Sequence, residues 1–166
     1  MLHAFIHEGA HAVVAMSYGE YEAFHVRPIG LEVTYNTPVV ARTGIKWGFI
    51  SSSANIITLA TGYMLLFGSR KFARIRNAFL KAVIYYATLL ALLLDSLNLS
   101  IGPFIYGGDA NGIAVGFGMN RYAIQVFFLI VFLVNRELVA QRLLPAYGVH
   151  TAILLLRPWL VSRSRI

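Results

Sequence analysis

The sequence has no cysteine and few charged residues. Without cysteine, disulfides and thiolate metal ligands are excluded, so any metal must be held by His, Asp or Glu. Charged residues make up 13% of the 166-residue chain, whereas soluble domains carry about 25%. Hydrophobic residues make up 58%, and the mean hydropathy is +0.66. This composition is typical of an integral membrane protein.

Acidic residues are also scarce, with 7 against 14 lysines and arginines and a net charge of +7. The basic residues lie between and after apolar runs, as in residues 70–76, which is typical of the ends of membrane spans rather than of a nucleic-acid surface. We therefore expect a lipid bilayer as partner and no nucleic acid. The N-terminus has no basic region and no small-residue cleavage site, so it does not resemble a cleavable signal peptide.

The hydropathy pattern predicts an all-α multi-span membrane protein with about four transmembrane helices. The expected helices cover residues 1–18, 47–69, 77–97 and 113–144, the last with a soft join at residues 116–118. Short β-branched runs around Gly and Pro in residues 20–46 predict a β hairpin between the first and second helices. We expect one domain over residues 1–166, with its core in about 1–120 and an interfacial tail at 145–166.

The most informative stretch is an H-E-x-x-H motif at residues 7–11. If residues 2–16 are helical, His7 and His11 lie one turn apart on the same face and can hold one Zn²⁺ through neutral ring nitrogens. Glu8 is then placed to take a proton from a zinc-bound water. The alternative is that these side chains only satisfy one another in a helical bundle. A carboxylate buried among apolar residues without a partner is costly, which favours the metal.

A third metal ligand must come from one of the two aspartates in the chain. Asp109 lies in a break of four glycines and a proline over residues 100–112, and irregular backbone carrying an acid usually lines a polar cavity. Asp109 could also cap the helix that follows. We favour Asp109 as the ligand, and Asp95, near the end of the third expected span, stays open as an alternative.

Two asparagines are candidates for binding a substrate backbone. Asn55 follows four small residues at the start of the second expected span, so it is either a hydrogen-bonding link between helices or a substrate contact, and both remain open. Asn111 lies two residues after Asp109 and is the second candidate. We expect His25 and His150 to be structural.

These features together resemble the site-2 protease family of intramembrane zinc metalloproteases. The resemblance is carried by His7-Glu8-Gly9-Ala10-His11, by Ser51-Ser52-Ser53-Ala54-Asn55 after a hairpin, and by Gly108-Asp109-Ala110-Asn111-Gly112, a relaxed form of that family's Asn-Pro-x-x-Asp-Gly segment. It covers roughly residues 1–120. It implies Zn²⁺ held by His7, His11 and an aspartate, Glu8 as general base and later acid, and a membrane-anchored protein substrate that binds along residues 31–35.

The resemblance implies an intramembrane metalloendopeptidase in a multi-pass protein, which we expect in a prokaryotic cell membrane. One alternative function is a membrane scaffold or chaperone that keeps the metal-site fold without turnover, and another is a multi-span zinc hydrolase with a non-peptide substrate. The charge rule places residues 70–76 in the cytoplasm and therefore the hairpin on the opposite side of the membrane. In the resembled family the hairpin region usually faces the cytoplasm. Both orientations stay open.

Overall fold

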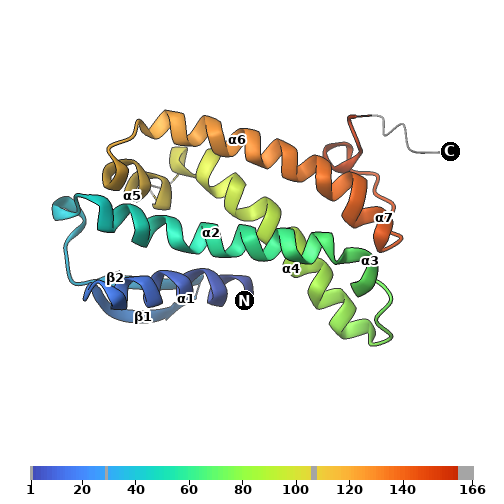
Figure 1. Cartoon of the computed structure of the whole chain (residues 1–166), viewed down its shortest axis with the longest axis horizontal. Coiled ribbons are helices and arrows are strands. Elements are labelled where there is room, and N and C mark those ends of the chain that lie inside the picture. The colour runs from blue at the N-terminus through green and yellow to red at the C-terminus, as the bar shows by residue number, and fades with distance from the viewer. Residues whose placement is uncertain (1, 29, 106–107, 161–166) are drawn as a thin grey trace.

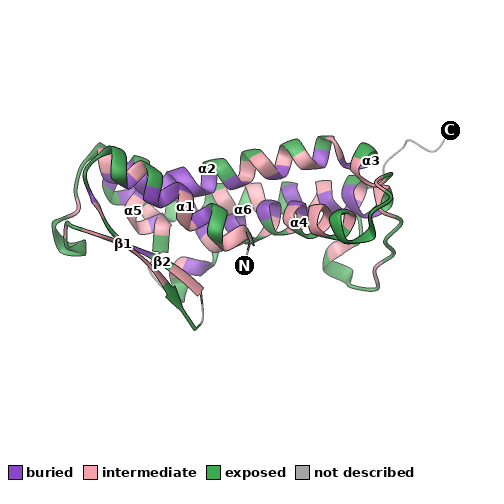
Figure 2. Cartoon of the chain, turned by 90° about the horizontal axis from the view of Figure 1, so that it is seen from below, coloured by how far each residue is buried: buried purple, intermediate pink, exposed green. Residues whose placement is uncertain are grey.

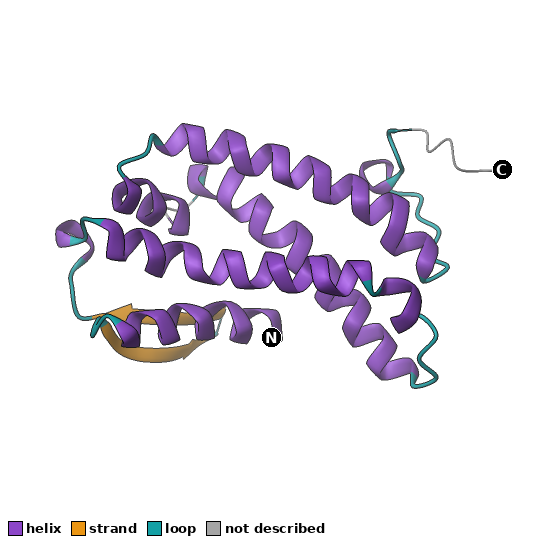
Figure 3. Ribbon diagram, in the orientation of Figure 1, coloured by secondary structure: helices purple, strands orange, loops and turns teal. Residues whose placement is uncertain are grey.

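The structure is a computed structural model that describes residues 2–28, 30–105 and 108–160. It is mostly helical, with one β hairpin between the first and second helices, as predicted (Figures 1 and 3). The helices are α1 (Leu2–Ser17), α2 (Ile45–Phe67), α3 (Ser69–Phe72), α4 (Ala78–Ser100), α5 (Gly108–Phe117), α6 (Arg121–Leu138) and α7 (Leu144–Ala146). The strands are β1 (Tyr21–Arg27) and β2 (Gly30–Tyr35), and a π-helical turn, η3 (Val139–Leu143), joins α6 to α7. Short 3₁₀ turns cover Val39–Ala41, Gly102–Phe104 and Leu154–Leu156.

Three helices in the described part of the chain are long and apolar enough to cross a membrane, not the predicted four. They are Ile45–Phe67, Ala78–Ser100 and the continuous run Arg121–Ala146. The first helix has 16 residues and so is about 24 Å long, less than the roughly 30 Å of a hydrocarbon core. At this length the described helix is not among those long and apolar enough to cross a membrane, and it packs against α2 and β2.

The predicted helix over residues 113–144 is wrong, because the chain breaks between α5 and α6. Gly118 has φ +64°, a left-handed conformation that ends α5. Asn120 then caps α6 by accepting a hydrogen bond from the Tyr122 backbone N–H at 2.8 Å. The soft join expected at residues 116–118 is thus a complete reversal. It turns α5 back onto α2.

Helix α2 is the centre of the fold and contacts α1, α4 and α5, while α6 packs on α4 (Figure 1). Small residues let α2 and α5 approach closely. A Cβ placed on Gly116 would lie 2.0 Å from the backbone nitrogen of Gly48, and one placed on Gly112 would lie 2.0 Å from Ser51 Oγ. Asp109, Gly112 and Gly116 share one face of α5. The glycine contact therefore fixes where Asp109 sits against α2.

The hairpin is antiparallel, with Tyr21 opposite Tyr35, Arg27 opposite Gly30, and an irregularity between Tyr21 and Ala23. It packs on α1 through β2. Buried residues run along the whole helix bundle (Figure 2) and form three apolar clusters, around Ala15 and Trp47, around Leu99 and Ile113, and around Leu66 and Leu143. Large apolar side chains are exposed on the outer faces, among them Met64 at 66% and Phe79 at 79%. Such faces are expected where helices meet lipid.

The described part of the predicted tail, residues 145–160, folds back against α6. The buried guanidinium of Arg136 donates to the backbone carbonyls of Leu155 and Arg157 and stacks 3.8 Å from the Trp159 ring. Residues 161–166 of that predicted tail lie outside the described residues.

Candidate metal centre

His7 and His11 lie one helical turn apart on the face of α1 that points into the protein. Both are buried, at 9% and 3% exposure, and their ring centroids are 5.0 Å apart. The 3.6-residue period of the helix sets this spacing. α1 is held in place by α2 on one side and β2 on the other.

Asp109 meets both histidines from α5. His7 Nε2 lies 3.2 Å from one Asp109 carboxylate oxygen, and His11 Nε2 lies 3.3 Å from the other. One donor atom from each of the three side chains falls within 4.8 Å of the other two, so the group could hold a metal ion. The structure thus brings together the three residues that the sequence analysis selected as ligands.

A backbone carbonyl orients the ring of His11. His11 Nδ1 lies 2.7 Å from the carbonyl oxygen of Ile50, which can only accept. The proton of the neutral imidazole is therefore on Nδ1, and the lone pair of Nε2 faces Asp109. Metal-binding histidines almost always have such a partner on the other ring nitrogen.

Asp95 faces Nδ1 of His7, as the Ile50 carbonyl faces Nδ1 of His11. Asp95 Oδ1 lies 3.4 Å from His7 Nδ1, on the opposite side of the ring from Asp109. The Asp95 carboxylate is buried and is also met by His3 Nε2 at 3.1 Å and by the Thr58 hydroxyl, which donates to it. His3, His7 and Asp95 form a second group that could hold a metal.

Sequence analysis missed His3 and Thr58. His3 precedes His7 by one turn, so the His3–His7–His11 spacing of four residues marked it as a member of the same helix face. Nothing in the sequence pointed to Thr58, because its partner Asp95 is 37 residues away on another helix.

Asn55 supports the Asp109 carboxylate. It is 1% exposed, and its amide donates to Asp109 Oδ2 at 2.9 Å. This contact links α2 to α5 and corresponds to the interhelical alternative for Asn55. Asn55 does not line the cavity described below.

Asn111 and the two histidines expected to be structural lie elsewhere. The Asn111 side-chain oxygen accepts from Arg121 Nη1 at 3.4 Å, and Asn111 does not line the cavity. His25 Nε2 lies 3.3 Å from Thr34 Oγ1 within the hairpin. His150 follows α7 at the other end of the chain.

A cavity of about 710 Å³ opens onto the metal-binding group. Its walls come from α1, β2, α4 and the start of α5, and Glu8 lines it beside His7, His11 and Asp109. Glu8 is half-buried. The cavity is large enough for a peptide segment and brings the Glu8 carboxylate next to the candidate ligands.

Tyr35 lines the same cavity from β2. Burial raises the pKa of its phenol, and the nearby Asp109 and Glu8 carboxylates raise it further. Tyr35 is therefore a neutral hydrogen-bond donor throughout the physiological range. Arg42 stacks 4.7 Å from its ring at the cavity wall.

The donor set fits a divalent metal. Two imidazoles have their Nε2 atoms turned toward one carboxylate, and a carbonyl or a carboxylate faces the Nδ1 of each ring. Three protein ligands leave a further coordination position for water or substrate. No family model, curated protein or solved structure matches this chain. The site itself therefore carries the functional inference.

Proposed function

We propose that the protein is an intramembrane zinc metalloendopeptidase similar to the site-2 proteases. The observation that carries the proposal is the convergence of His7 and His11 Nε2 on Asp109, in a cavity that Glu8 also lines. The function follows from this set because binding and acid–base groups meet at one place with room for a substrate.

Zinc is the metal that the donors favour. Two neutral imidazoles and one carboxylate without thiolate suit Zn²⁺ with an open position. His7, His11 and Asp109 would hold it, Ile50 and Asp95 would orient the two rings, and Asn55 would hold the carboxylate. A bound zinc supplies a water of lowered pKa and polarises the scissile carbonyl.

Glu8 is the general base and acid in this proposal. Its carboxylate takes one proton from the attacking water as the C–O bond forms, and passes a proton to the leaving amine nitrogen as the C–N bond breaks. Glu8 follows His7 directly in α1 and lines the same cavity. No other carboxylate is needed for this proton transfer.

The substrate is an extended segment of a membrane-anchored protein. Leu31, Glu32 and Val33 of β2 line the cavity, and β2 is paired only with β1 among the described residues. An extended peptide can add to a free strand edge through backbone hydrogen bonds. Of the three helices long and apolar enough to cross a membrane, α4 lines the cavity and α2 packs against α1, which suits a substrate that reaches the site from the bilayer.

Turnover of a labelled transmembrane peptide by the zinc-loaded protein tests the proposal. Glu8→Gln should keep the zinc and lower the cleavage rate by about 10²–10⁴-fold, because it removes the proton transfer and not a ligand. Glu22→Gln is the matched control, since Glu22 is exposed on β1 and does not line the cavity. Zinc binding by the wild type without any cleavage would instead favour the membrane scaffold.

A further inference from the structure

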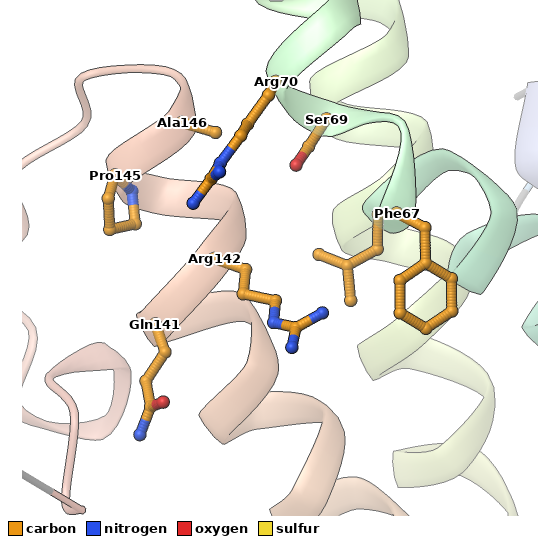
Figure 4. Close-up of a pocket in the computed structure, with 8 residues that line it drawn as sticks. Phe67, Ser69, Arg70, Gln141, Arg142, Pro145 and Ala146 are labelled. Atoms are coloured by element: carbon orange, nitrogen blue, oxygen red, sulfur yellow. The ribbon is translucent and has the colours of Figure 1, made fainter. Parts of the chain in front are cut away.

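A second cavity, of about 700 Å³, lies at the opposite end of α2 from the hairpin. It is bounded by the end of α2, by α3, by the π-helical turn η3 and by α7 (Figure 4). Its lining includes Phe67, Ser69, Arg70, Gln141, Arg142 and Pro145. None of these residues belongs to the metal centre.

Two arginines give this cavity an uncompensated positive charge. Arg70 comes from α3 and Arg142 from η3, and Figure 4 shows both guanidinium groups extending into the space between the two walls. No carboxylate of the described residues forms an ion pair with either. Glu137, the acid on the adjoining turn, is occupied by Arg136, Gln141 and two backbone N–H groups. Two free guanidinium groups match an anion with several oxygens, such as a phosphate.

The cavity lies where two apolar helices end. The candidate spans Ile45–Phe67 and Arg121–Ala146 terminate in residues that line it or adjoin it. This is the level of the lipid headgroups if these helices cross a bilayer. Phe67, 70% exposed beside the cavity, offers apolar surface for an acyl chain, and Arg142 lies 5.9 Å from its ring centroid.

The local backbone supports a built site at this point. η3 is a π-helical turn inserted between α6 and α7, and such turns are frequently found at functional sites. Gln141 and Arg142 are both presented from this turn. Basic pockets between transmembrane helices bind anionic lipid headgroups.

From these observations we infer that the Arg70–Arg142 cavity binds the phosphodiester headgroup of an anionic phospholipid. The inference does not depend on zinc or on proteolysis. It depends on the charge of the cavity and on its level at the ends of two apolar helices.

The test is lipid retention by the full chain in nanodiscs of neutral phosphatidylcholine with a minor share of phosphatidylglycerol. Native mass spectrometry after transfer to neutral detergent should show about one phosphatidylglycerol per chain. Arg70→Gln with Arg142→Gln should weaken this binding roughly 30-fold, about 5-fold for each arginine. Arg74→Gln with Arg76→Gln is the matched control, because it removes two exposed charges from the same end of the molecule outside the cavity.

Equal losses in both double variants, or equal retention of both lipids by the wild type, would overturn the inference. Competition with inorganic phosphate distinguishes a lipid headgroup from a free phosphate ion as the bound anion. Displacement of the lipid by phosphate at micromolar concentration would also contradict a lipid site. Arg70→Lys with Arg142→Lys keeps the charge and serves if the glutamine variant does not fold. It should retain the lipid more weakly than the wild type, since the planar guanidinium fork is lost.

Discussion

Two aspartates face opposite nitrogens of the His7 ring, and they differ in what else they contact. Asp109 also reaches His11, so it lies where the third ligand of a metal held by both histidines is expected. Asp95 is buried and is held by His3 and Thr58, so it is suited to orient His7. In the proposed site, Asp109 is therefore the ligand and Asp95 the positioning residue.

Asp95→Asn should weaken zinc binding by about 10–100-fold without changing the number of zinc ions bound at saturation. The neutral amide lacks the negative charge that makes His7 Nε2 a more basic ligand for the metal. Competition with a chelator measures the affinity. Ser96→Ala is the matched control, because Ser96 is buried beside Asp95 and its hydroxyl donates to the Leu92 and Leu93 carbonyls of its own helix. Unchanged affinity in Asp95→Asn would remove the positioning role.

Glu20 connects the end of α1 to the start of α2. It accepts from Lys46 Nζ at 2.5 Å and from the Thr37 hydroxyl at 2.7 Å. The hydrogen bond from Lys46, followed by that from Thr37, holds the pKa of the Glu20 carboxyl below its usual range. Because the pKa is lower in the folded state, this stabilisation is fully present above the unfolded-state pKa and disappears as the pH falls through the folded-state pKa.

Glu20→Gln should therefore lower Tm at pH 7, and the difference from the wild type should shrink as the pH falls below about 4.5. Thermal unfolding in detergent across pH 7 to pH 3.5 measures this. Glu22→Gln, two residues along and exposed, should follow the wild type at every pH. A gap between wild type and Glu20→Gln that stays constant with pH would mean that ionisation of Glu20 does not matter.

At the scale of elements, the site depends on how closely α5 approaches α2. A methyl group on Gly116 would collide with the Gly48 backbone, which cannot move without shifting α2. The same face of α5 carries Asp109 toward Asn55. Helix packing and ligand placement are therefore one feature.

Gly116→Ala should destabilise the protein by about 1–3 kcal/mol and weaken zinc binding, because the added methyl overpacks the α2–α5 contact. Thermal unfolding and chelator competition report the two effects. Val115→Ala is the control on the same helix, since Val115 is 52% exposed. Normal zinc affinity in Gly116→Ala would show that the ligands tolerate separation of α5 from α2.

The sequence was sufficient to predict the helices that begin or end at charge clusters, but not the break before α6. The glycines at 116 and 118 predicted a soft join, but the left-handed conformation of Gly118 and the Asn120 cap, which make it a reversal, are visible only in the structure. The hairpin was predictable because β-branched runs alternate with turn residues. Residues 2–17 are as apolar as a span and differ from one in length, since burial in protein and burial in lipid select the same residues.

The metal-binding group was predictable in part for a different reason. The spacing of His7 and His11 is local, and helical periodicity alone places them together. Scarcity narrowed the third ligand to two aspartates, and the glycine- and proline-rich break around Asp109 favoured it over Asp95. The Asp95–Thr58–His3 contacts join three helices and follow from packing that no local pattern encodes.

At the scale of the whole molecule, three candidate spans imply that successive connecting segments lie on alternate sides of the membrane. The chain has no native cysteine, so single cysteines can be placed without background. Val40→Cys precedes α2, Arg74→Cys follows it, and Met119→Cys follows α4; all three positions are exposed.

In sealed vesicles, an impermeant thiol reagent should label Val40→Cys and Met119→Cys from one side and Arg74→Cys only from the other. The reason is that α2 and α4 are each long and apolar enough to cross the bilayer once. Labelling after detergent lysis confirms that every cysteine can react. Reaction of Val40→Cys and Arg74→Cys from the same side would mean that α2 does not cross the membrane.

The metal centre is tested most directly by the zinc content of the detergent-purified protein after reconstitution. The wild type should hold about one zinc per chain, as expected for a site with three protein ligands. His7→Ala and Asp109→Ala should hold none, while Asp95→Ala should still fill at saturating zinc. A wild type that binds no zinc, or an Asp109→Ala variant that binds it as well as the wild type, would contradict the assignment of this site.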